Sequence, residues 1–125
     1  MAAGFDRETL DLLRDIEEVE IETRAGPGAA IHRAIIWVVV DGEDRVLIRT
    51  YLGPDSRWYR EATAYPDVVI VAGDRTLDAR AETAADRERT ASYDRVLVRK
   101  YAGHRSTQAM LAGDLVPTTL ELTPR

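Results

Sequence analysis

Cysteine is absent from the 125-residue sequence. The chain therefore has no disulfide, no thiolate zinc site and no cysteine nucleophile, and this composition suits a reducing compartment. The longest apolar run, residues 34–40, is far shorter than the roughly 18 residues that suggest a membrane span. The first ten residues hold no basic segment followed by an apolar one, so we expect no secretory signal. Together these absences predict a cytoplasmic protein without a membrane partner.

Motifs for nucleotide binding and nucleophilic catalysis are missing as well. The sequence contains no Walker loop, no G-x-G-x-x-G fingerprint and no G-x-S-x-G elbow. Its two histidines, His32 and His104, belong to no spaced cluster of His, Asp and Glu, so we predict no metal or haem site. The net charge is −5, and the arginines are mixed with acidic residues instead of gathering on one stripe. Duplex nucleic acid binders usually show a basic surplus, so we predict no nucleic acid partner.

Capping and breaking residues predict three helices, and a further short turn or helix is expected over residues 106–113. Asp6 is expected to cap a first helix, because its carboxylate can accept from free N–H groups of the first turn. Ser56 is the expected N-cap of a second, short helix, which Pro66 ends. Thr83 with Asp86 resembles a capping box, which predicts a longer third helix reaching residue 101.

Apolar alternation and β-branched runs predict six strands. They cover residues 19–23, 34–40, 45–51, 68–72, 76–82 and 118–123. The run 34–40 is apolar on both faces, which predicts a central strand buried on both sides and paired with the next strand along the chain. Hairpin-length links require antiparallel pairing. We therefore predict one α+β domain, residues 1–125, built on a six-stranded antiparallel barrel with an N-terminal helix and helices between strands; an open sheet with helices on one face is the alternative.

Five short motifs follow one another in a distinctive order. They are Ile36–Val39 ("IWVV"), Arg49 with Gly53, Arg57–Arg60 ("RWYR"), Lys100-Tyr101 and Thr119–Leu122 ("TLEL"). In this order they resemble an uncharacterised bacterial family, domain of unknown function 2255, over nearly the whole chain. This resemblance implies no known activity.

A more distant resemblance is to the deazaflavin-dependent nitroreductase type of split barrel, and through it to the pyridoxamine-phosphate-oxidase-like flavin barrels. It rests on Gly53-Pro54, Trp58-Tyr59 and Pro66. Tyr65 replaces the asparagine of that pattern, and the basic link, in which Arg24 and Arg33 correspond, lacks its serine. The resemblance implies a flavin-type split barrel, FMN or a deazaflavin as cofactor, oxidoreductase chemistry, and a homodimer that builds its cofactor cleft from both chains.

The junction between the strand ending near Thr50 and the helix beginning at Ser56 is the candidate site. A helix N-terminus offers unpaired N–H groups and a partial positive charge. Guanidinium groups beside it can hold a phosphate or carboxylate in bidentate fashion, and an aromatic side chain can flank a planar ring. We predict that an anionic cofactor tail binds here. The predicted cofactor-binding residues are Arg49, Thr50, Gly53, Ser56, Arg57, Trp58 and Arg60.

The same residues also fit a purely structural interpretation. Arg57 and Arg60 can pair with acidic neighbours such as Asp55 or Glu61, and Trp58 can belong to the core-facing side of its helix. Two hypotheses therefore stay open. The first is a flavin- or deazaflavin-binding oxidoreductase-like protein of unknown substrate. The alternative is a cofactor-free split barrel that acts as a small anionic-ligand binding module or a dimeric interaction protein.

Overall fold

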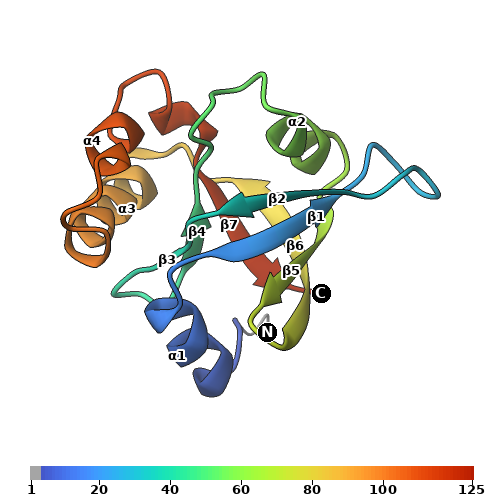
Figure 1. The fold of residues 1–125 in the computed structure, drawn as a ribbon, viewed down its shortest axis with the longest axis horizontal. Helices are drawn as coiled ribbons and strands as arrows, with labels where there is room; N and C mark the ends of the chain where they lie inside the picture. The colour runs from blue at the N-terminus through green and yellow to red at the C-terminus, as the bar shows by residue number, and fades with distance from the viewer. Residues whose placement is uncertain (1–3) are drawn as a thin grey trace.

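The computed structural model describes residues 4–125, which form one curled antiparallel sheet with helices packed around it (Figure 1). The strands are β1 (Val19–Thr23), β2 (His32–Ile36), β3 (Val39–Val40), β4 (Val46–Ile48), β5 (Asp67–Ala72), β6 (Arg75–Thr83) and β7 (Leu120–Pro124). The helices are α1 (Arg7–Asp15), α2 (Arg57–Ala64), α3 (Arg87–Lys100), α4 (Ser106–Met110) and the 3₁₀ turn η1 (Val116–Thr118). Within the described residues, no helix is both long and apolar enough to cross a bilayer.

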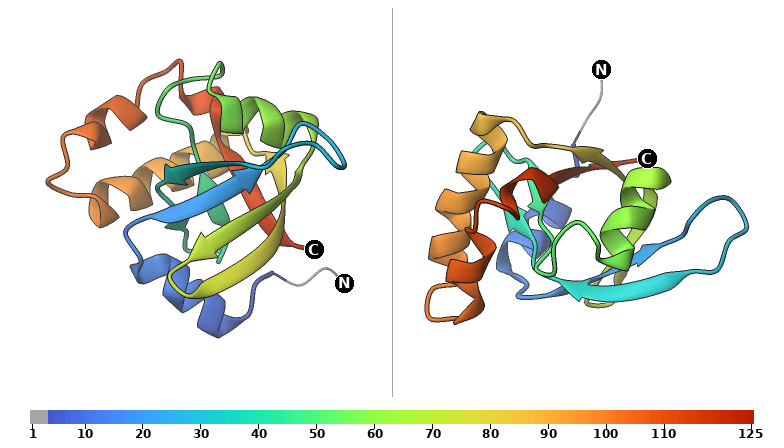
Figure 2. Two further views of the ribbon diagram at one scale, coloured as in Figure 1. Left: turned by 45° about the vertical axis from the view of Figure 1, so that its right-hand side comes forward. Right: turned by 90° about the horizontal axis from the view of Figure 1, so that it is seen from above.

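The order of strands in the sheet is β2-β1-β5-β6-β7-β4-β3, and every neighbouring pair is antiparallel. The two edge strands, β2 and β3, follow each other in the chain and are separated only by Trp37 and Val38. A link of this length reaches about 11 Å at most. The sheet must therefore curl until its two edges lie together, as Figure 2 shows from two further directions.

The predicted central strand over residues 34–40 is wrong. The run breaks at Trp37 and Val38, which gives seven strands instead of six, and its two halves form the two edges of the sheet. The second half, β3, pairs with β4 as predicted, whereas β2 pairs with β1. Ile35 is 68% exposed, so the apolar pattern of β2 does not record burial on both faces. Hydrophobic periodicity identifies apolar side chains but not what covers them.

Side chains from the end of α3 close the seam between β2 and β3. The Val38 N–H donates to the Tyr101 hydroxyl at 3.2 Å, and the Val38 carbonyl accepts from Lys100 Nζ at 2.7 Å. The same hydroxyl donates to the Glu17 carbonyl at 2.6 Å, and Lys100 Nζ also donates to the Leu13 carbonyl at 2.9 Å. A buried peptide group without a partner costs about 1–3 kcal/mol. Lys100 and Tyr101 therefore stabilise the break that interrupts the strand.

The helix caps confirm two predictions and correct one. The Asp6 carboxylate accepts from the backbone N–H of Thr9 at 2.8 Å, as expected of the N-cap of α1. Ser56 occupies the N-cap position of α2, although its hydroxyl makes no capping hydrogen bond. The predicted capping box with Thr83 is wrong, because Thr83 belongs to β6 and the N-cap of α3 is Asp86.

Two hydrophobic cores lie on opposite sides of β4. Val46 and Ile48 belong to the core inside the curled sheet, whereas Leu47 belongs to a second core against α3 and α4. Successive side chains of a strand point to opposite faces. Arg49, two residues after Leu47, therefore points to the same side as Leu47, toward α3 and away from the inside of the sheet.

Candidate functional site

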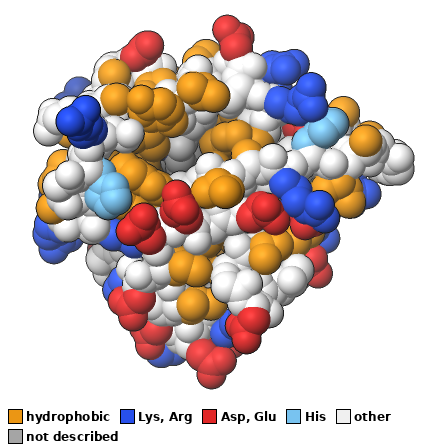
Figure 3. Space-filling model, viewed as in Figure 1, with side chains coloured by type: hydrophobic (Ala, Val, Ile, Leu, Met, Phe, Trp, Pro, Cys, Tyr) orange, Lys and Arg blue, Asp and Glu red, His pale blue; other side chains and the backbone are white. Residues whose placement is uncertain are grey.

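A cavity of about 460 Å³ opens beside the seam, between α2, the segment around α4 and strand β2 (Figure 3). Its lining consists of Glu17, Glu18, Ala34, Ile35, Ile36, Trp37, Arg49, Thr50, Tyr51, Leu52, Trp58, His104, Ser106 and Met110. Figure 3 shows hydrophobic side chains gathered around the hollow. The cavity thus combines an apolar interior with a few ionisable side chains.

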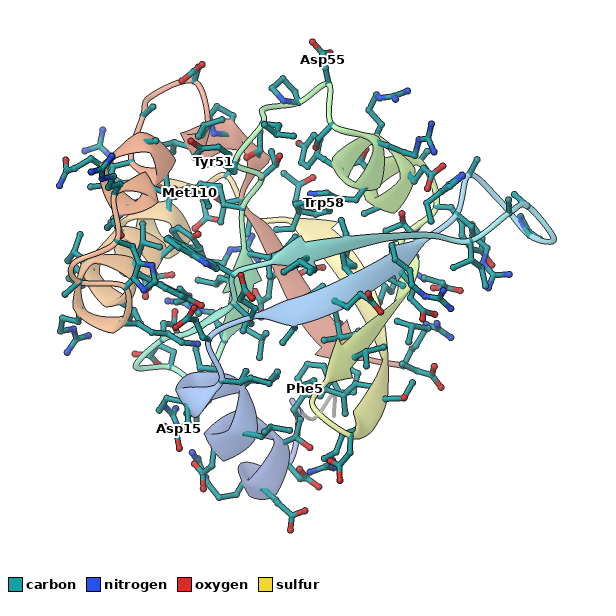
Figure 4. All side chains as sticks on the ribbon, in the orientation of Figure 1. Phe5, Asp15, Tyr51, Asp55, Trp58 and Met110 are labelled. Atoms are coloured by element: carbon teal, nitrogen blue, oxygen red, sulfur yellow. The ribbon has the colours of Figure 1, made fainter. Side chains whose placement is uncertain are left out.

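Two tryptophans from different elements line this cavity. Trp37 stacks face to face on Tyr101, with ring centroids 3.9 Å apart and an interplanar angle of 5°, and the His104 ring meets Trp37 edge-on at 5.2 Å. Trp58, on α2, belongs to the core as expected and also lines the cavity. Figure 4 shows Trp58 on one side of the hollow and Tyr51 with Met110 on the other. Aromatic walls of this kind suit a planar ring, because aromatic groups prefer stacked or edge-to-face contacts.

Large apolar side chains are exposed around the same cavity. Ile35 is 68% exposed, Tyr51 54% and Leu52 78%, and all three line the cavity. Single exposed apolar residues need no explanation, but several at one concave site indicate an interaction surface.

Arg49 contributes to the cavity wall, but its charge is used inside the protein. Its side chain is fully buried. Nη1 donates to the Asp94 carboxylate and to the Met110 carbonyl, both at 2.8 Å, and Nε donates to the Thr119 hydroxyl at 2.8 Å. The guanidinium also lies 4.1 Å above the centre of the Tyr93 ring. These partners hold the guanidinium in the second core, away from the N-terminus of α2.

Three of the predicted residues meet in the loop that leads into α2. The Thr50 and Ser56 hydroxyl oxygens lie 3.0 Å apart, and Thr50 Oγ1 also donates to the Gly53 carbonyl at 3.3 Å. The Leu52 N–H donates to Thr50 Oγ1 at 3.2 Å. Gly53 has φ +90°, a left-handed conformation that favours glycine. This hydrogen-bonded turn positions one wall of the cavity and the first residue of α2.

Arg57 and Arg60 lie on the surface beside that turn and are not part of the cavity lining. Arg60 Nε donates to the Asp55 backbone carbonyl at 3.1 Å. Within residues 4–125 neither guanidinium has a carboxylate oxygen within 4.0 Å, so the surface ion pairs of the structural interpretation are not formed. The first turn of α2 holds no acidic residue either. Neither charge is therefore held in a surface ion pair, although the Arg57 guanidinium contributes to a lowered pKa of Glu61.

Glu61 ties α2 to the sheet. Its carboxylate accepts from the Thr23 hydroxyl at 2.9 Å and lies 3.0 Å from His32 Nδ1. Burial acts to raise the pKa of Glu61, but the hydrogen bonds to Thr23 and His32, together with the nearby Arg57 guanidinium, outweigh it and lower that pKa below its usual value. The contact fixes α2 against β1 and β2, which in turn fixes Trp58 in the cavity.

Several lining residues were missed by the sequence reasoning. Glu17 and Glu18 follow the expected first helix in the sequence, and Trp37 lies within the run 34–40 that predicts a buried strand. Trp37 lines the cavity because the strand breaks at Trp37 and Val38. Glu17 and Glu18 line it because α1 ends at Asp15, shortly before them. The glutamates have no ion-pair partner within 4.0 Å among the residues described, so this side of the cavity is acidic. Residues 4–125 hold no group of three His, Cys, Asp or Glu that could bind a metal ion.

The sequence matches a family over residues 9–122, described as "Uncharacterized protein conserved in bacteria (DUF2255)". The chain belongs to this family. The match confirms the assignment that the order of the five motifs predicted. No curated protein matches the chain.

Solved structures share the fold of this DUF2255 protein at low identity. An F420-H2 dependent reductase (FDR-A) is 19% identical with a TM-score of 0.63, and the match covers 98% of this chain and 99% of that one. The FAD binding protein from Mycobacterium smegmatis is 20% identical with a TM-score of 0.63, covering 99% and 92%. HutZ, the heme storage protein from Vibrio cholerae, is 14% identical with a TM-score of 0.64, covering 98% and 92%. Against two further structures, this chain spans only 52% and 54% of their length. These matches confirm the predicted α+β split-barrel fold.

Proposed function

We propose that this DUF2255 protein binds a planar, flavin-type cofactor in the cavity lined by Trp37 and Trp58. The observation that carries the proposal is the aromatic lining of a cavity of about 460 Å³. Small-molecule sites are typically concave, about 300–1,000 Å³ in volume, and mostly apolar with a few polar groups. The likeness of the fold to a F420-H2 dependent reductase and a FAD binding protein supports the same cofactor class.

The lining suits the ring of such a cofactor better than its phosphate. Apolar and aromatic side chains line the cavity and can contact the ring. Among the lining residues that the structure describes, Arg49 is the one lysine or arginine, and it is already paired with Asp94. The acidic side of the cavity, Glu17 and Glu18, repels a phosphate. An anionic tail therefore extends toward the N-terminus of α2, where free backbone N–H groups and the Arg57 guanidinium favour it.

FMN or a deazaflavin, when bound, supplies hydride transfer, and the protein then binds and orients the cofactor. The proposed activity is that of an oxidoreductase on a substrate not yet assigned. Absorbance and mass spectrometry of the protein purified from its natural host test this directly. A flavin or deazaflavin released on denaturation supports the proposal. If the purified protein releases no flavin or deazaflavin, the result favours the cofactor-free split barrel that binds a small anionic ligand or acts as a dimer.

Titration calorimetry tests the position of the phosphate. FMN, riboflavin and a deazaflavin are titrated into the wild type, Arg57→Ala and Ser56→Ala. Losing a charge-assisted hydrogen bond costs about 1.5–3 kcal/mol, or roughly ten- to a hundredfold in affinity. Arg57→Ala should therefore weaken the binding of FMN and leave the affinity for riboflavin unchanged. Ser56→Ala should reduce FMN affinity less, because the backbone N–H groups remain.

Arg87→Ala is the matched control for this titration. Arg87 is exposed and opens α3 directly after its N-cap, as Arg57 opens α2. We expect Arg87→Ala to leave FMN affinity unchanged. Equal affinity for riboflavin and FMN would show that the phosphate does not contribute to binding. Binding of none of the three compounds would contradict the flavin-type cofactor itself.

A homodimer completes this proposal, because a second copy can cover the exposed apolar side chains that line the cavity. Ile35, Tyr51 and Leu52 are all exposed at that place. Sedimentation should give a dimer of the 14.0 kDa chain, and Leu52→Asp should shift it toward monomer. A wild type that stays monomeric at micromolar concentration contradicts the dimer.

Haem is a second candidate ligand, because one histidine and one methionine, His104 and Met110, both line the cavity. These are side chains that ligate haem iron in proteins, and the fold is shared with a heme storage protein. A Soret absorbance that appears on adding haemin, and that His104→Ala removes, would favour haem over a flavin. A Soret band that persists in His104→Ala would exclude His104 as a ligand.

A further inference from the structure

Lys100 is the only lysine among the 17 lysine and arginine residues of the sequence. It ends α3 and lines a second cavity of about 430 Å³, which shares no lining residue with the Trp37 cavity. This second cavity is bounded by α1, by the turn after β3 and by α3, and its other basic lining residues are Arg14 and Arg99. A single partly buried amine in such surroundings is chemically distinct from every other side chain of the protein.

The two hydrogen bonds of Lys100 are compatible with a neutral amine. Nζ donates to the Leu13 carbonyl at 2.9 Å and to the Val38 carbonyl at 2.7 Å. A neutral amine has two hydrogens, so both can remain in these bonds while the lone pair takes another tetrahedral direction. Within the described part of the chain, Nζ has no carboxylate oxygen within 4.0 Å that would hold it in the charged form.

Burial favours the neutral amine of Lys100, although Nζ also lies 5.3 Å from the centre of the Tyr101 ring, which favours the cation. The basic residues of the lining favour a negatively charged reagent. Burial lowers the pKa of Lys100 to about 8, against the opposing effect of the Asp15 carboxylate on α1. The other ionisable groups lining this cavity are Arg14, Asp41 and Arg99. Arg14 is paired with Asp11 and Asp44, and the Asp41 carboxylate is held by Arg45 and Ser92. Arg99 has no carboxylate oxygen within 4.0 Å among the described residues, so its charge can attract an anion.

We propose that Lys100 is an acylation site whose acyl donor is a small acyl phosphate admitted to this cavity. The neutral amine attacks the carbonyl carbon, and the new C–N bond forms as the C–O bond to phosphate breaks. The phosphate leaves with the electron pair of that bond, and the amine loses one proton to water. Arg99 attracts the anionic donor and stabilises the departing phosphate.

Acylation at Lys100 also has a structural consequence. The product amide has one N–H, so only one of the two bonds to Leu13 and Val38 can remain. Because Val38 follows Trp37 in the seam, the modification loosens the segment that presents Trp37 to the first cavity. Acylated protein should therefore melt at a lower temperature than unmodified protein.

The test is the rate of acetylation of the folded protein by acetyl phosphate, measured at Lys100 by peptide mass spectrometry. With a pKa of about 8, the amine at pH 7.5 is roughly two hundredfold richer in its neutral form than an ordinary lysine. A less basic amine is also a weaker nucleophile, so we expect a rate at least about tenfold above that of lysine in a short reference peptide. Lys100→Arg should remove the modified peptide and leave only the N-terminal amine reactive.

A second reagent and a matched variant isolate the role of Arg99. Arg99→Gln should slow acetylation by acetyl phosphate several-fold but leave the rate with an uncharged acetyl ester unchanged. Arg95→Gln, one turn earlier on the exposed side of α3, should change neither rate. A Lys100 rate at or below that of the reference peptide with both reagents overturns the acylation site. An Arg99→Gln variant that reacts with acetyl phosphate as fast as wild type overturns the acyl phosphate as donor.

Discussion

Arg49 and Arg57 were expected to hold the same anion, yet the fold uses them in opposite ways. Arg49 is fully buried and bonded to Asp94, Thr119 and the Met110 carbonyl. Arg57, at the start of α2, is exposed and has no carboxylate oxygen within 4.0 Å among the residues described. A buried charge must be compensated by the protein itself, whereas an exposed one is not committed to any partner. The contrast separates an arginine that builds the cavity from one that can act on its ligand.

The largest expected effect is that of removing the buried charge. Arg49→Met leaves Asp94 without its cation and the Thr119 hydroxyl and Met110 carbonyl without this donor. Breaking a buried pair by removing one partner typically costs about 3–5 kcal/mol. Because Asp94 is partly exposed, we expect the lower end, about 3 kcal/mol, in the free energy of unfolding measured by urea denaturation.

Arg49→Lys is the matched control, since it keeps the charge but not the planar fork that reaches three acceptors. We expect its stability to lie between those of Arg49→Met and the wild type. If Arg49→Met unfolds at the wild-type urea concentration, the ion pair contributes nothing and the contrast with Arg57 disappears.

Local chemistry made much of the fold predictable. Asp6 caps the first helix as expected, and the alternation of β6 was visible in the sequence. The break at Val38 was not predictable, because the groups that bond its peptide come from Lys100 and Tyr101, more than 60 residues later. Sequence periodicity reports local preference and contains no information about such distant partners.

In the candidate site, too, some features could be predicted from the sequence and others could not. The turn of Thr50, Gly53 and Ser56 was predictable from turn and cap chemistry, and the structure brings these residues together. The direction of Arg49 could have been found from the alternation after Leu47, because successive strand residues point to opposite faces. The contribution of Trp37 could not, since it depends on the break at Val38.

A second buried charge, Asp41, extends the comparison to carboxylates. Burial acts to raise the pKa of Asp41, but hydrogen bonds from Ser92, Arg45 and the Glu43 N–H outweigh it and lower that pKa. A lowered folded-state pKa stabilises the protein above the unfolded pKa of about 3.9, and this stabilisation is lost as pH falls through the folded pKa.

Asp41→Asn should therefore cost about 1–3 kcal/mol at pH 7 and flatten the loss of stability on acidification below about pH 4. Urea denaturation at a series of pH values measures both effects. The exposed Asp55→Asn is the control, and its stability profile should follow the wild type. An Asp41→Asn variant with the wild-type acid profile would show that Asp41 is not a source of the acid sensitivity.

A smaller effect is expected at Tyr93, beneath the Arg49 guanidinium. Its hydroxyl is buried and has no hydrogen-bond partner among the described residues, while its ring lies 4.1 Å from the Arg49 guanidinium carbon. Tyr93→Phe removes the unpaired hydroxyl and keeps the ring, so stability should stay constant or rise by up to about 1 kcal/mol. Tyr93→Leu also removes the ring contact and should be destabilising. A loss above about 1 kcal/mol in Tyr93→Phe would mean that the hydroxyl has a partner, such as a buried water.

The smallest expected effect on stability is at Arg57, and this is what distinguishes it from Arg49. Arg57 opens α2, where the helix dipole disfavours a cation by about 0.3–1 kcal/mol at most. Arg57→Ala should therefore leave the free energy of unfolding unchanged or raise it by a few tenths of a kcal/mol. Paired urea and calorimetric measurements on one preparation then separate the two arginines, because the same variant is expected to lose FMN affinity. If Arg57→Ala instead costs more than about 1 kcal/mol of stability, Arg57 supports the fold, and any loss of FMN affinity cannot be assigned to a contact with the phosphate.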